Sequence, residues 1–286
     1  MISIVLNTFK RLESLEDQLE ACCQQSLPVS EILIWNNGPS LDANKLRKRF
    51  PKVVIVNSSK NFGVWSRFSL ALNCMSDFIL MLDDDTIPGS RYLENCYSSF
   101  KKQPGLYGCR GLRFLSKQSY EPYIEFGWQS HNEEAQRVDI VGHSWFFPRK
   151  YLNFFWRDAA ALNNSPYCGE DIHFSYTLQK YGNIDSFVPP HKINQPESWG
   201  ANTELSKKFG SDPNAISLRP SATADFDRAI RSYVNLGFKL IVPDQLSSEG
   251  LVKEPDPELS IKNKVHIVAP KLYRFIRLLH RIAKKD

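Results

Sequence analysis

Three consecutive aspartates, Asp83, Asp84 and Asp85, follow directly after the apolar run FILML at residues 78–82. Like charges repel, and an unpaired carboxylate is costly to bury, so this arrangement calls for a bound cation. Carboxylate oxygens are the ligands that Mn²⁺ and Mg²⁺ prefer, and these ions commonly complete their shell with phosphate oxygens. We therefore expect a divalent metal and a phosphorylated substrate here. Two alternatives are a solvated turn and the aspartyl nucleophile of a phosphotransferase or phosphatase.

Short apolar runs alternate with helical spacing over the first hundred residues. Strands are expected at residues 2–6, 31–37, 53–57 and 78–82, and helices at 12–23, 41–50 and 64–75. This alternation indicates the parallel sheet of a doubly wound α/β fold, which binds ligands at the carboxyl ends of its strands. Polar residues follow every expected strand: NTFKR, WNNG, NSSKNFG and DDD. The chain has neither of the common glycine-rich phosphate loops, so a metal is the natural phosphate holder.

The pattern changes after residue 103. The stretches LYGCRGLRFL and VDIVGHSWFFP read as strands, and helices are expected near 149–155, 172–180 and 224–236. The segment 188–222 is rich in Pro, Ser and Asn, and we expect it to be ordered but irregular. We divide the chain into a nucleotide-binding half at 1–103, a second half at 104–242, and a linker with a tail at 243–286.

The net charge of +5 is concentrated at the C-terminus. The last 16 residues, KLYRFIRLLHRIAKKD, hold six Lys or Arg and one acid, and the remaining 270 residues balance. Helical spacing of the apolar residues predicts a basic amphipathic helix over 271–286. Such a helix can lie on an anionic membrane, dock on the catalytic part or a partner, or contact nucleic acid. Nucleic acid is not favoured, because the sequence shows no recognisable DNA-binding motif.

The sequence also predicts where the protein works. No basic leader with a cleavage site precedes the first strand, and no apolar run approaches the ~20 residues needed to span a bilayer. The six cysteines form no CxxC pair and no zinc spacing, so we expect reduced thiols in the core. These features predict a cytoplasmic protein, with peripheral contact at the inner face of a membrane as an alternative.

Six motifs together resemble the GT-A glycosyltransferases: VLNTFKR, ILIWNN, NFGVWSRF, FILMLDDDT, VGHSWFFPRKYL and CGEDIHFSYTLQKYG. Their order and spacing over roughly residues 1–240 are most similar to the exostosin-like family, which transfers N-acetylhexosamine, and more broadly to glycosyltransferase family 2. The resemblance implies a Rossmann-like, mostly parallel central sheet flanked by helices. It also implies a smaller antiparallel sheet on the acceptor side, within 104–242, and a UDP-sugar donor with Mn²⁺ or Mg²⁺.

The same resemblance implies roles for individual residues. Asp85 and Asp83 would hold the metal, with Asp83 and Asp84 near the ribose and sugar. The remaining donor contacts would come from residues after the other strands: Thr8, Arg11, Asn36, Asn37, Asn61 and Arg67. Asn36 and Asn37 would read the base edge, although Asn-Asn-Gly is also a good turn regardless of function.

Glu170 and Asp171 are the expected catalytic carboxylates. An inverting enzyme would use one of them as the general base on the acceptor hydroxyl, and the family pattern gives more weight to Asp171. The exostosin-like match favours retention instead, with the carboxylate either stabilising an oxocarbenium-like centre or orienting the acceptor. Carboxylates are also common at helix starts for structural reasons alone.

A late histidine completes the metal shell in many GT-A enzymes. His191 is the best-placed candidate, whereas His143 and His173 are expected to pack in the core. The family's donor-binding Arg is missing from SWGANTELSKKFG. Lys192, Lys207 and Lys208 are the candidates to replace it, and Trp199 is a candidate to stack on a sugar.

The sequence thus predicts a metal-dependent glycosyltransferase that moves a hexose or N-acetylhexosamine from a UDP-sugar to a glycan or lipid-linked glycan. Retention is favoured over inversion. Two rivals remain at this stage: a transferase that acts on modified DNA bases, and a catalytically silent module that binds nucleotide sugars.

Overall fold

The computed structural model describes residues 1–10, 12–158, 165–202, 204, 216 and 219–242. Its first half alternates strands with helices, as the sequence predicts. The strands are β1 (Ile2–Thr8), β2 (Val29–Asn36), β3 (Val53–Asn57) and β4 (Phe78–Leu82), and the helices between them are α1 (Glu13–Cys23), α2 (Ala43–Arg49) and α3 (Ser66–Ala71). Adjacent strands in the order β3-β2-β1-β4 run parallel, so their carboxyl ends meet at one edge of the sheet.

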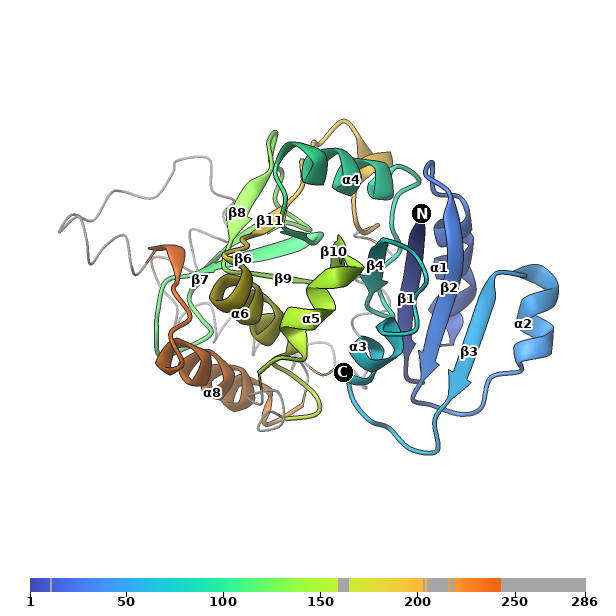
Figure 1. Cartoon of the computed structure of the whole chain (residues 1–286), viewed down its shortest axis with the longest axis horizontal. Helices are drawn as coiled ribbons and strands as arrows, with labels where there is room; N and C mark the ends of the chain where they lie inside the picture. The colour runs from blue at the N-terminus through green and yellow to red at the C-terminus, as the bar shows by residue number, and fades with distance from the viewer. Residues whose placement is uncertain (11, 159–164, 203, 205–215, 217–218, 243–286) are drawn as a thin grey trace, which may run out of the picture.

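The second half of the chain extends the same sheet. Helix α4 (Tyr92–Lys102) leads into β5 (Leu106–Tyr107), and the full eight-stranded order is β3-β2-β1-β4-β10-β5-β11-β8 (Figure 1). The added strands are β10 (Ser144–Pro148), β11 (Ser186–Val188) and β8 (Gln136–Val138). Strand β10 is buried along its whole length, and it runs antiparallel to β4 with Ser144 opposite Leu82. Because of this reversal, residues just before β10 lie beside residues just after β4.

Helices cover both faces of the large sheet. Alternate residues of a strand face opposite sides, so Ile4 and Leu6 pack with α1 and α4, whereas Val5 packs on the other side with Phe68 of α3. The 3-10 helix η1 (Arg149–Tyr151), helix α5 (Leu152–Phe155) and helix α6 (Glu170–Gly182) contribute to that second layer. The parallel strands are therefore apolar on both faces, as their continuous apolar sequences predict.

A smaller antiparallel sheet lies beside the large one, as expected. Its strands, in the order β7-β6-β9, are β7 (Tyr123–Gly127), β6 (Arg110–Phe114) and β9 (Ile140–Gly142). Helix α6 and helix α8 (Ala222–Asn235) pack on it through a separate apolar cluster that includes Leu112, Ile172 and Tyr233. Helix α6 therefore contributes to both apolar clusters.

The element boundaries differ from the sequence predictions at two places that concern the site. Helix α3 spans only Ser66–Ala71, since the chain after it makes turns that end in bonds such as Asn73 N–H to Leu70 O (2.9 Å). Helix α6 begins at Glu170, so both expected catalytic carboxylates lie in its first turn. The 188–222 segment contains the short 3-10 helix η3 (Pro196–Ser198).

Some predictions concern residues outside the described ranges. These are the basic amphipathic tail at 271–286, the linker before it, Arg11, Lys207 and Lys208. Within the ranges that the structure does describe, no helix has the length and apolar character that crossing a bilayer requires.

Candidate active site

Side chains of helix α1 bind the backbone of the loop that carries the three aspartates. The Ser14 hydroxyl donates to the Asp84 backbone carbonyl (2.7 Å), and the Gln18 amide donates to the carbonyls of Asp83 and Thr86 (2.7 Å each). Gln18 is almost completely buried, and its amide supplies hydrogen bonds to loop carbonyls that water cannot easily reach. These contacts use the backbone of the loop and fix its path at the end of β4.

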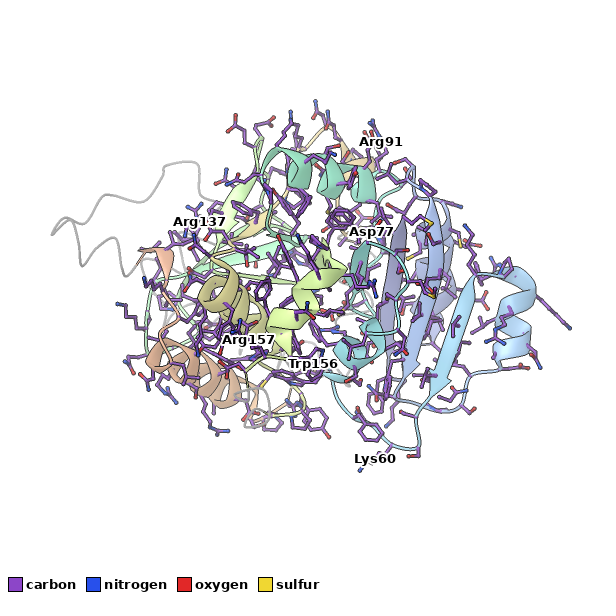
Figure 2. All side chains as sticks on the ribbon, in the orientation of Figure 1. Lys60, Asp77, Arg91, Arg137, Trp156 and Arg157 are labelled. Carbon is purple, nitrogen blue, oxygen red and sulfur yellow. The ribbon has the colours of Figure 1, made fainter. Side chains whose placement is uncertain are left out.

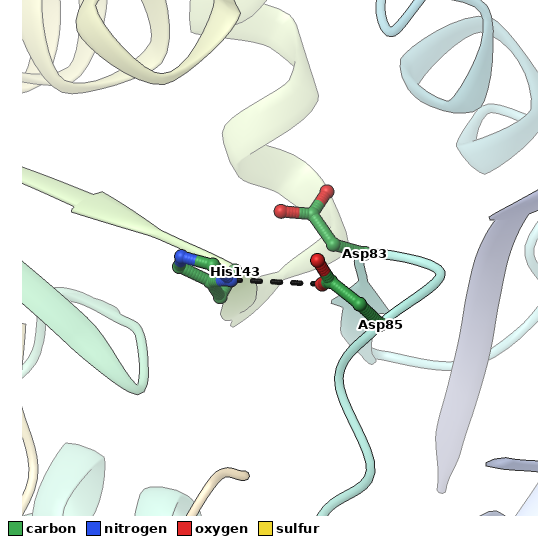
Figure 3. A group of neighbouring side chains, drawn as sticks. All are labelled: Asp83, Asp85 and His143. Carbon is green, nitrogen blue, oxygen red and sulfur yellow. Dashed lines mark ion pairs between the residues drawn. The ribbon is translucent and has the colours of Figure 1, made fainter. Parts of the chain in front are cut away.

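Asp83, Asp85 and His143 form a compact group at this edge of the sheet (Figure 3). Their ligand atoms all lie within 4.8 Å of one another, and Asp85 Oδ1 is 3.7 Å from His143 Nδ1. The backbone N–H of Asp83 donates to the His143 carbonyl (3.0 Å), which ties the end of β4 to the start of β10. The imidazole stacks on the Trp128 ring with 4.0 Å between ring centroids. The Trp128 ring therefore helps to hold the imidazole in this orientation.

The group has the properties of a divalent-metal site. Two carboxylates and one imidazole nitrogen suit Mn²⁺, and a site of mainly oxygen donors also suits Mg²⁺. His143 Nδ1 is buried and has no hydrogen-bond partner among the described residues, an arrangement that leaves this nitrogen available to a ligand. The three side chains keep partial exposure, between 13% and 29%, so an ion with phosphate oxygens can reach them.

His143, rather than the predicted His191, is the histidine in this group. His191 lies in an aromatic cluster instead, with ring centroids 4.8 Å from Trp199 and 5.3 Å from His131. The placement of His143 follows from the antiparallel β10, because this pairing puts the residue before β10 beside the residue after β4. The expectation that His143 packs in the core is therefore wrong. The same expectation for His173 is confirmed, since its ring nitrogens bond Phe155 O (2.8 Å) and the Tyr233 hydroxyl (3.0 Å).

Arg67 connects the aspartate loop to Glu170 in the first turn of helix α6. Its guanidinium pairs with Asp83 Oδ1 through one nitrogen and with Glu170 Oε1 (2.8 Å) through another. The side chain is 2% exposed, and its guanidinium carbon lies 4.3 Å from the centre of the Trp145 ring. Charge-assisted hydrogen bonds in such a buried place are strong and directional. Arg67 therefore fixes Asp83 and Glu170 relative to each other, although 103 residues separate Arg67 from Glu170.

Glu170 and Asp171 begin helix α6 after Gly169, which has a φ of 89°. Burial raises the pKa of the Glu170 carboxyl, and the negative charges of Asp171 and Asp83 raise it further, while Arg67 opposes the shift. Burial likewise raises the pKa of the Asp171 carboxyl, to about 6, against the effect of the Ile172 backbone N–H that donates to Asp171 Oδ1 (2.7 Å). A carboxylate with a pKa nearer neutrality is a better proton acceptor for a hydroxyl than an ordinary aspartate.

Asn36 and Asn37 are buried, and their amide groups are bonded within the protein. Asn37 donates to Asn7 Oδ1 (3.1 Å) and to the Gly63 carbonyl (3.0 Å), and it accepts from the Phe62 backbone N–H (2.9 Å). Asn36 donates to Pro39 O (2.6 Å) and Asn57 Oδ1 (2.8 Å) and accepts from Gly38 N–H (3.0 Å). Both side chains join the strand ends to the loops that follow them. Reading a base edge would require some of these bonds to break.

Thr8 and Asn61 are the remaining predicted donor contacts in the described ranges. The Thr8 hydroxyl at the end of β1 is buried and lacks a hydrogen-bond partner within the part of the chain that the structure describes, which is compatible with a role in ligand binding. Asn61 Oδ1 accepts from the Gly63 backbone N–H (2.8 Å), so this side chain shapes the turn before α3. The role predicted for Asn61 in donor binding stays a prediction.

Gly63 allows that turn to approach the segment before α6. Its φ is 75°, and a Cβ built there would lie 1.8 Å from the Pro166 carbonyl oxygen. We expect Gly63→Ala to lower the free energy of unfolding by roughly 2–4 kcal/mol, from backbone strain and overpacking together. Gly142→Ala is the matched control, because a Cβ there meets nothing within 4 Å. Urea denaturation measures both, and equal stability of the two variants would contradict the assigned role of Gly63.

The family of the chain follows from its sequence over this same region. A model of glycosyl transferase family 2 matches residues 3–162, which is more than half of the chain. The chain belongs to glycosyl transferase family 2. This family 2 region includes the aspartate loop, Arg67 and His143, whereas Glu170 and Asp171 lie just beyond it. No curated protein sequence matches the chain.

The solved structure of GalNAc-T7 shares the GT-A fold with this family 2 protein. GalNAc-T7 with UDP, GalNAc and Mn²⁺ superposes with a TM-score of 0.57 at 10% identity, over 87% of this chain and 58% of that one. S. aureus TarS 1-349 in complex with UDP gives a TM-score of 0.47 at 11% identity, over 88% of this chain and 75% of that one. At such identities the GalNAc-T7 likeness shows the fold alone.

The small sheet of this family 2 glycosyltransferase contributes polar residues that the sequence reasoning missed. Arg110 pairs with the buried Glu125 (2.7 Å) across β6 and β7 and donates to the Tyr123 hydroxyl (3.2 Å). Burial raises the pKa of the Tyr120 phenol, and the negative charge of the nearby Asp171 raises it further. The residue pattern in YIEFG could have indicated that Glu125 lies on the buried face of a strand. Its pairing with Arg110, however, depends on strand register.

Proposed function

We propose that this family 2 protein transfers a sugar from a UDP-sugar to a hydroxyl group of a glycan or lipid-linked glycan. The observation that carries the proposal is the convergence of Asp83, Asp85 and His143 with the Arg67–Glu170 pair at the carboxyl edge of the sheet. The GalNAc-T7 structure, which holds UDP, GalNAc and Mn²⁺ on the same fold, supports this choice of donor and metal. Family membership supports catalysis over a silent binding module.

The residues divide into a metal-holding set and a proton-accepting set. Asp83, Asp85 and His143 would hold a divalent ion, which neutralises diphosphate charge as the leaving group departs. Arg67 keeps Asp83 in place and neutralises the buried Glu170. Asp171 accepts the proton of the acceptor hydroxyl while the acceptor oxygen bonds to the anomeric carbon and the bond from that carbon to UDP breaks.

We propose inversion at the anomeric carbon, in place of the retention that the exostosin-like resemblance implies. Retention through a covalent intermediate needs a free carboxylate nucleophile, and Glu170 is occupied by the buried pair with Arg67. Inversion needs one general base, and Asp171 has the burial and the raised pKa for that role. The anomeric proton coupling of the product, measured by NMR, tests this assignment.

Donor binding is tested most directly by thermal stability. We expect UDP and one UDP-sugar to raise the melting temperature only when Mn²⁺ or Mg²⁺ is present, because the ion links the diphosphate to the aspartates. At about a hundredfold excess over Kd, a ligand adds about 2.7 kcal/mol to the free energy of unfolding. A panel of UDP-glucose, UDP-galactose and UDP-N-acetylglucosamine, each with and without metal, identifies the sugar. An absence of any metal-dependent shift would refute the proposal.

Asp171 is expected to be required for transfer but not for donor binding. Asp171→Asn should lower kcat by about 10²–10⁴-fold while UDP still raises the melting temperature, because only the proton acceptor is lost. In the wild type, the base must be ionised, so kcat should rise as the pH increases through about 6 and stay level above it. The pH profiles of both proteins check this. A variant that keeps the wild-type rate would exclude Asp171 as the base.

A further inference from the structure

A hollow of about 340 Å³ lies next to the aspartate loop, outside the groups that the proposed mechanism uses. Its walls are mainly apolar, with an amide and a carboxylate among them: Ile87, Pro88, Gly89, Pro196, Trp199, Asn202 and Glu204. This size is near the lower end of the range for small-molecule sites and suits one substituted sugar ring. The combination of a tryptophan with a few polar groups is suited to a carbohydrate, which has apolar C–H faces and hydroxyl edges.

One wall of the hollow follows the aspartate loop along the chain. Ile87, Pro88 and Gly89 begin two residues after Asp85, so one wall is a direct extension of the metal-holding loop. Backbone hydrogen bonds attach the opposite wall to it: Gly89 N–H donates to Trp199 O (2.9 Å), and Asn202 N–H donates to Ile87 O (2.8 Å). A ligand in this hollow would therefore be held at a fixed position relative to the aspartates.

The Trp199 ring is held in one orientation. Its indole N–H donates to the Lys192 carbonyl (2.7 Å), and the ring stacks on His191 at an interplanar angle of 19°. Burial and the neighbouring His131 lower the pKa of His191 to about 4, so this stacking partner is uncharged at neutral pH. A tryptophan fixed in this way offers an apolar surface without the entropic cost of ordering it upon binding.

We propose that this hollow is a subsite for one pyranose ring of the saccharide acceptor, with Trp199 as its stacking surface. The inference rests on the proposed function, because it assumes that the acceptor is a saccharide. Asn202 and Glu204 supply groups that can hydrogen-bond sugar hydroxyls, and the wall made by Ile87, Pro88 and Gly89 continues the chain from the aspartate loop. The subsite is distinct from the donor site, so saccharide binding there does not compete with UDP.

Saturation-transfer NMR with the methyl glycosides of glucose, galactose and N-acetylglucosamine tests the subsite on the full-length protein. At least one glycoside should bind the wild type, and its signal should persist when Mn²⁺ and excess UDP are added. Trp199→Ala should weaken that binding by about tenfold or more, since the stacking surface is removed. Trp199→Phe keeps an aromatic surface but loses the bond to Lys192, and it should stay within about threefold of the wild type.

Trp156→Ala is the control, because Trp156 is an exposed tryptophan at the end of α5 that does not line the hollow (Figure 2). It should bind the glycoside as the wild type does. The subsite is refuted if no glycoside binds the wild type, if UDP displaces the glycoside, or if Trp199→Ala binds unchanged. Metal-dependent stabilisation by UDP is measured in parallel on each variant. If that stabilisation is intact while glycoside binding fails, the subsite is wrong and the proposed donor chemistry still stands.

Discussion

Replacing Asp85 with asparagine should lower kcat by roughly a hundredfold to a thousandfold, the loss seen when one group that stabilises developing charge is removed. The change keeps the shape of the side chain and removes its negative charge. Asp85 is the carboxylate nearest to His143 in the group, and both side chains are only partly exposed. A divalent ion held by one carboxylate and one imidazole is bound weakly, so the Mn²⁺ concentration that gives half-maximal activity should rise as well.

The matched control for this substitution is Asp77→Asn. Asp77 lies at the opposite end of β4, before Phe78, and it is exposed (Figure 2). Its backbone carbonyl accepts from the Arg149 N–H (2.8 Å), a bond that the substitution leaves in place. Asp77→Asn should keep the rate and the Mn²⁺ requirement of the wild type. If Asp85→Asn behaves in the same way, the metal is not held at the end of β4.

The aspartate loop could be predicted from the sequence because its position depends on local pattern alone. A continuous apolar run such as FILML indicates a buried parallel strand, and carboxyl ends of parallel strands share one edge of the sheet. Asp83 and Asp85 had therefore to lie at that edge, near Thr8 at the end of β1. The helix expected near residues 172–180 likewise put Glu170 and Asp171 at a helix start, where the structure also has them.

His143 could not be predicted in the same way, because its position depends on the direction of β10. SWFFP reads as a buried strand, but a buried strand of five residues carries no sign of whether it runs parallel or antiparallel to its neighbour. The antiparallel pairing with β4 brings His143 beside Asp85, and a parallel pairing would have placed it at the other edge. The contact between Arg67 and Glu170 could not be predicted from the sequence for a related reason, since it depends on how α3 and α6 pack against one face of the sheet.

For Asn36 and Asn37, the sequence predicted the position but not the hydrogen-bond partners. The sequence placed them correctly at the end of β2, but polar residues at a strand end can bind ligands or bind the chain itself. Their side chains bond to Asn7, Asn57 and the loop before α3. Sequence position predicted that these amides lie at the binding edge, and only the register of three strands and a loop shows which partners they have.

The second large effect is expected at Arg67. Arg67→Met keeps an unbranched apolar side chain and removes the guanidinium charge, which leaves Asp83 and the buried Glu170 without their shared partner. Breaking a buried ion pair from one side typically lowers the free energy of unfolding by about 3–5 kcal/mol, because the remaining charge is uncompensated. Urea denaturation at neutral pH measures the loss. The matched control is Arg91→Met, which breaks the exposed pair with Glu94 and should leave stability nearly unchanged.

The pH dependence of that loss identifies its cause. Burial already raises the pKa of Glu170, and removing Arg67 takes away the main opposing influence, so the pKa should rise further in the variant. A carboxyl whose folded-state pKa exceeds its unfolded-state pKa destabilises the fold as the pH rises, and it stops doing so once it is protonated in both states. The deficit of Arg67→Met should therefore shrink as the pH falls toward about 5, while adding Glu170→Gln to the variant should restore part of the stability at neutral pH. Neither treatment should restore transfer, because Asp83 still lacks the group that positions it. A deficit that is independent of pH and of Glu170→Gln would mean that Arg67 acts through its packing on Trp145 rather than through charge.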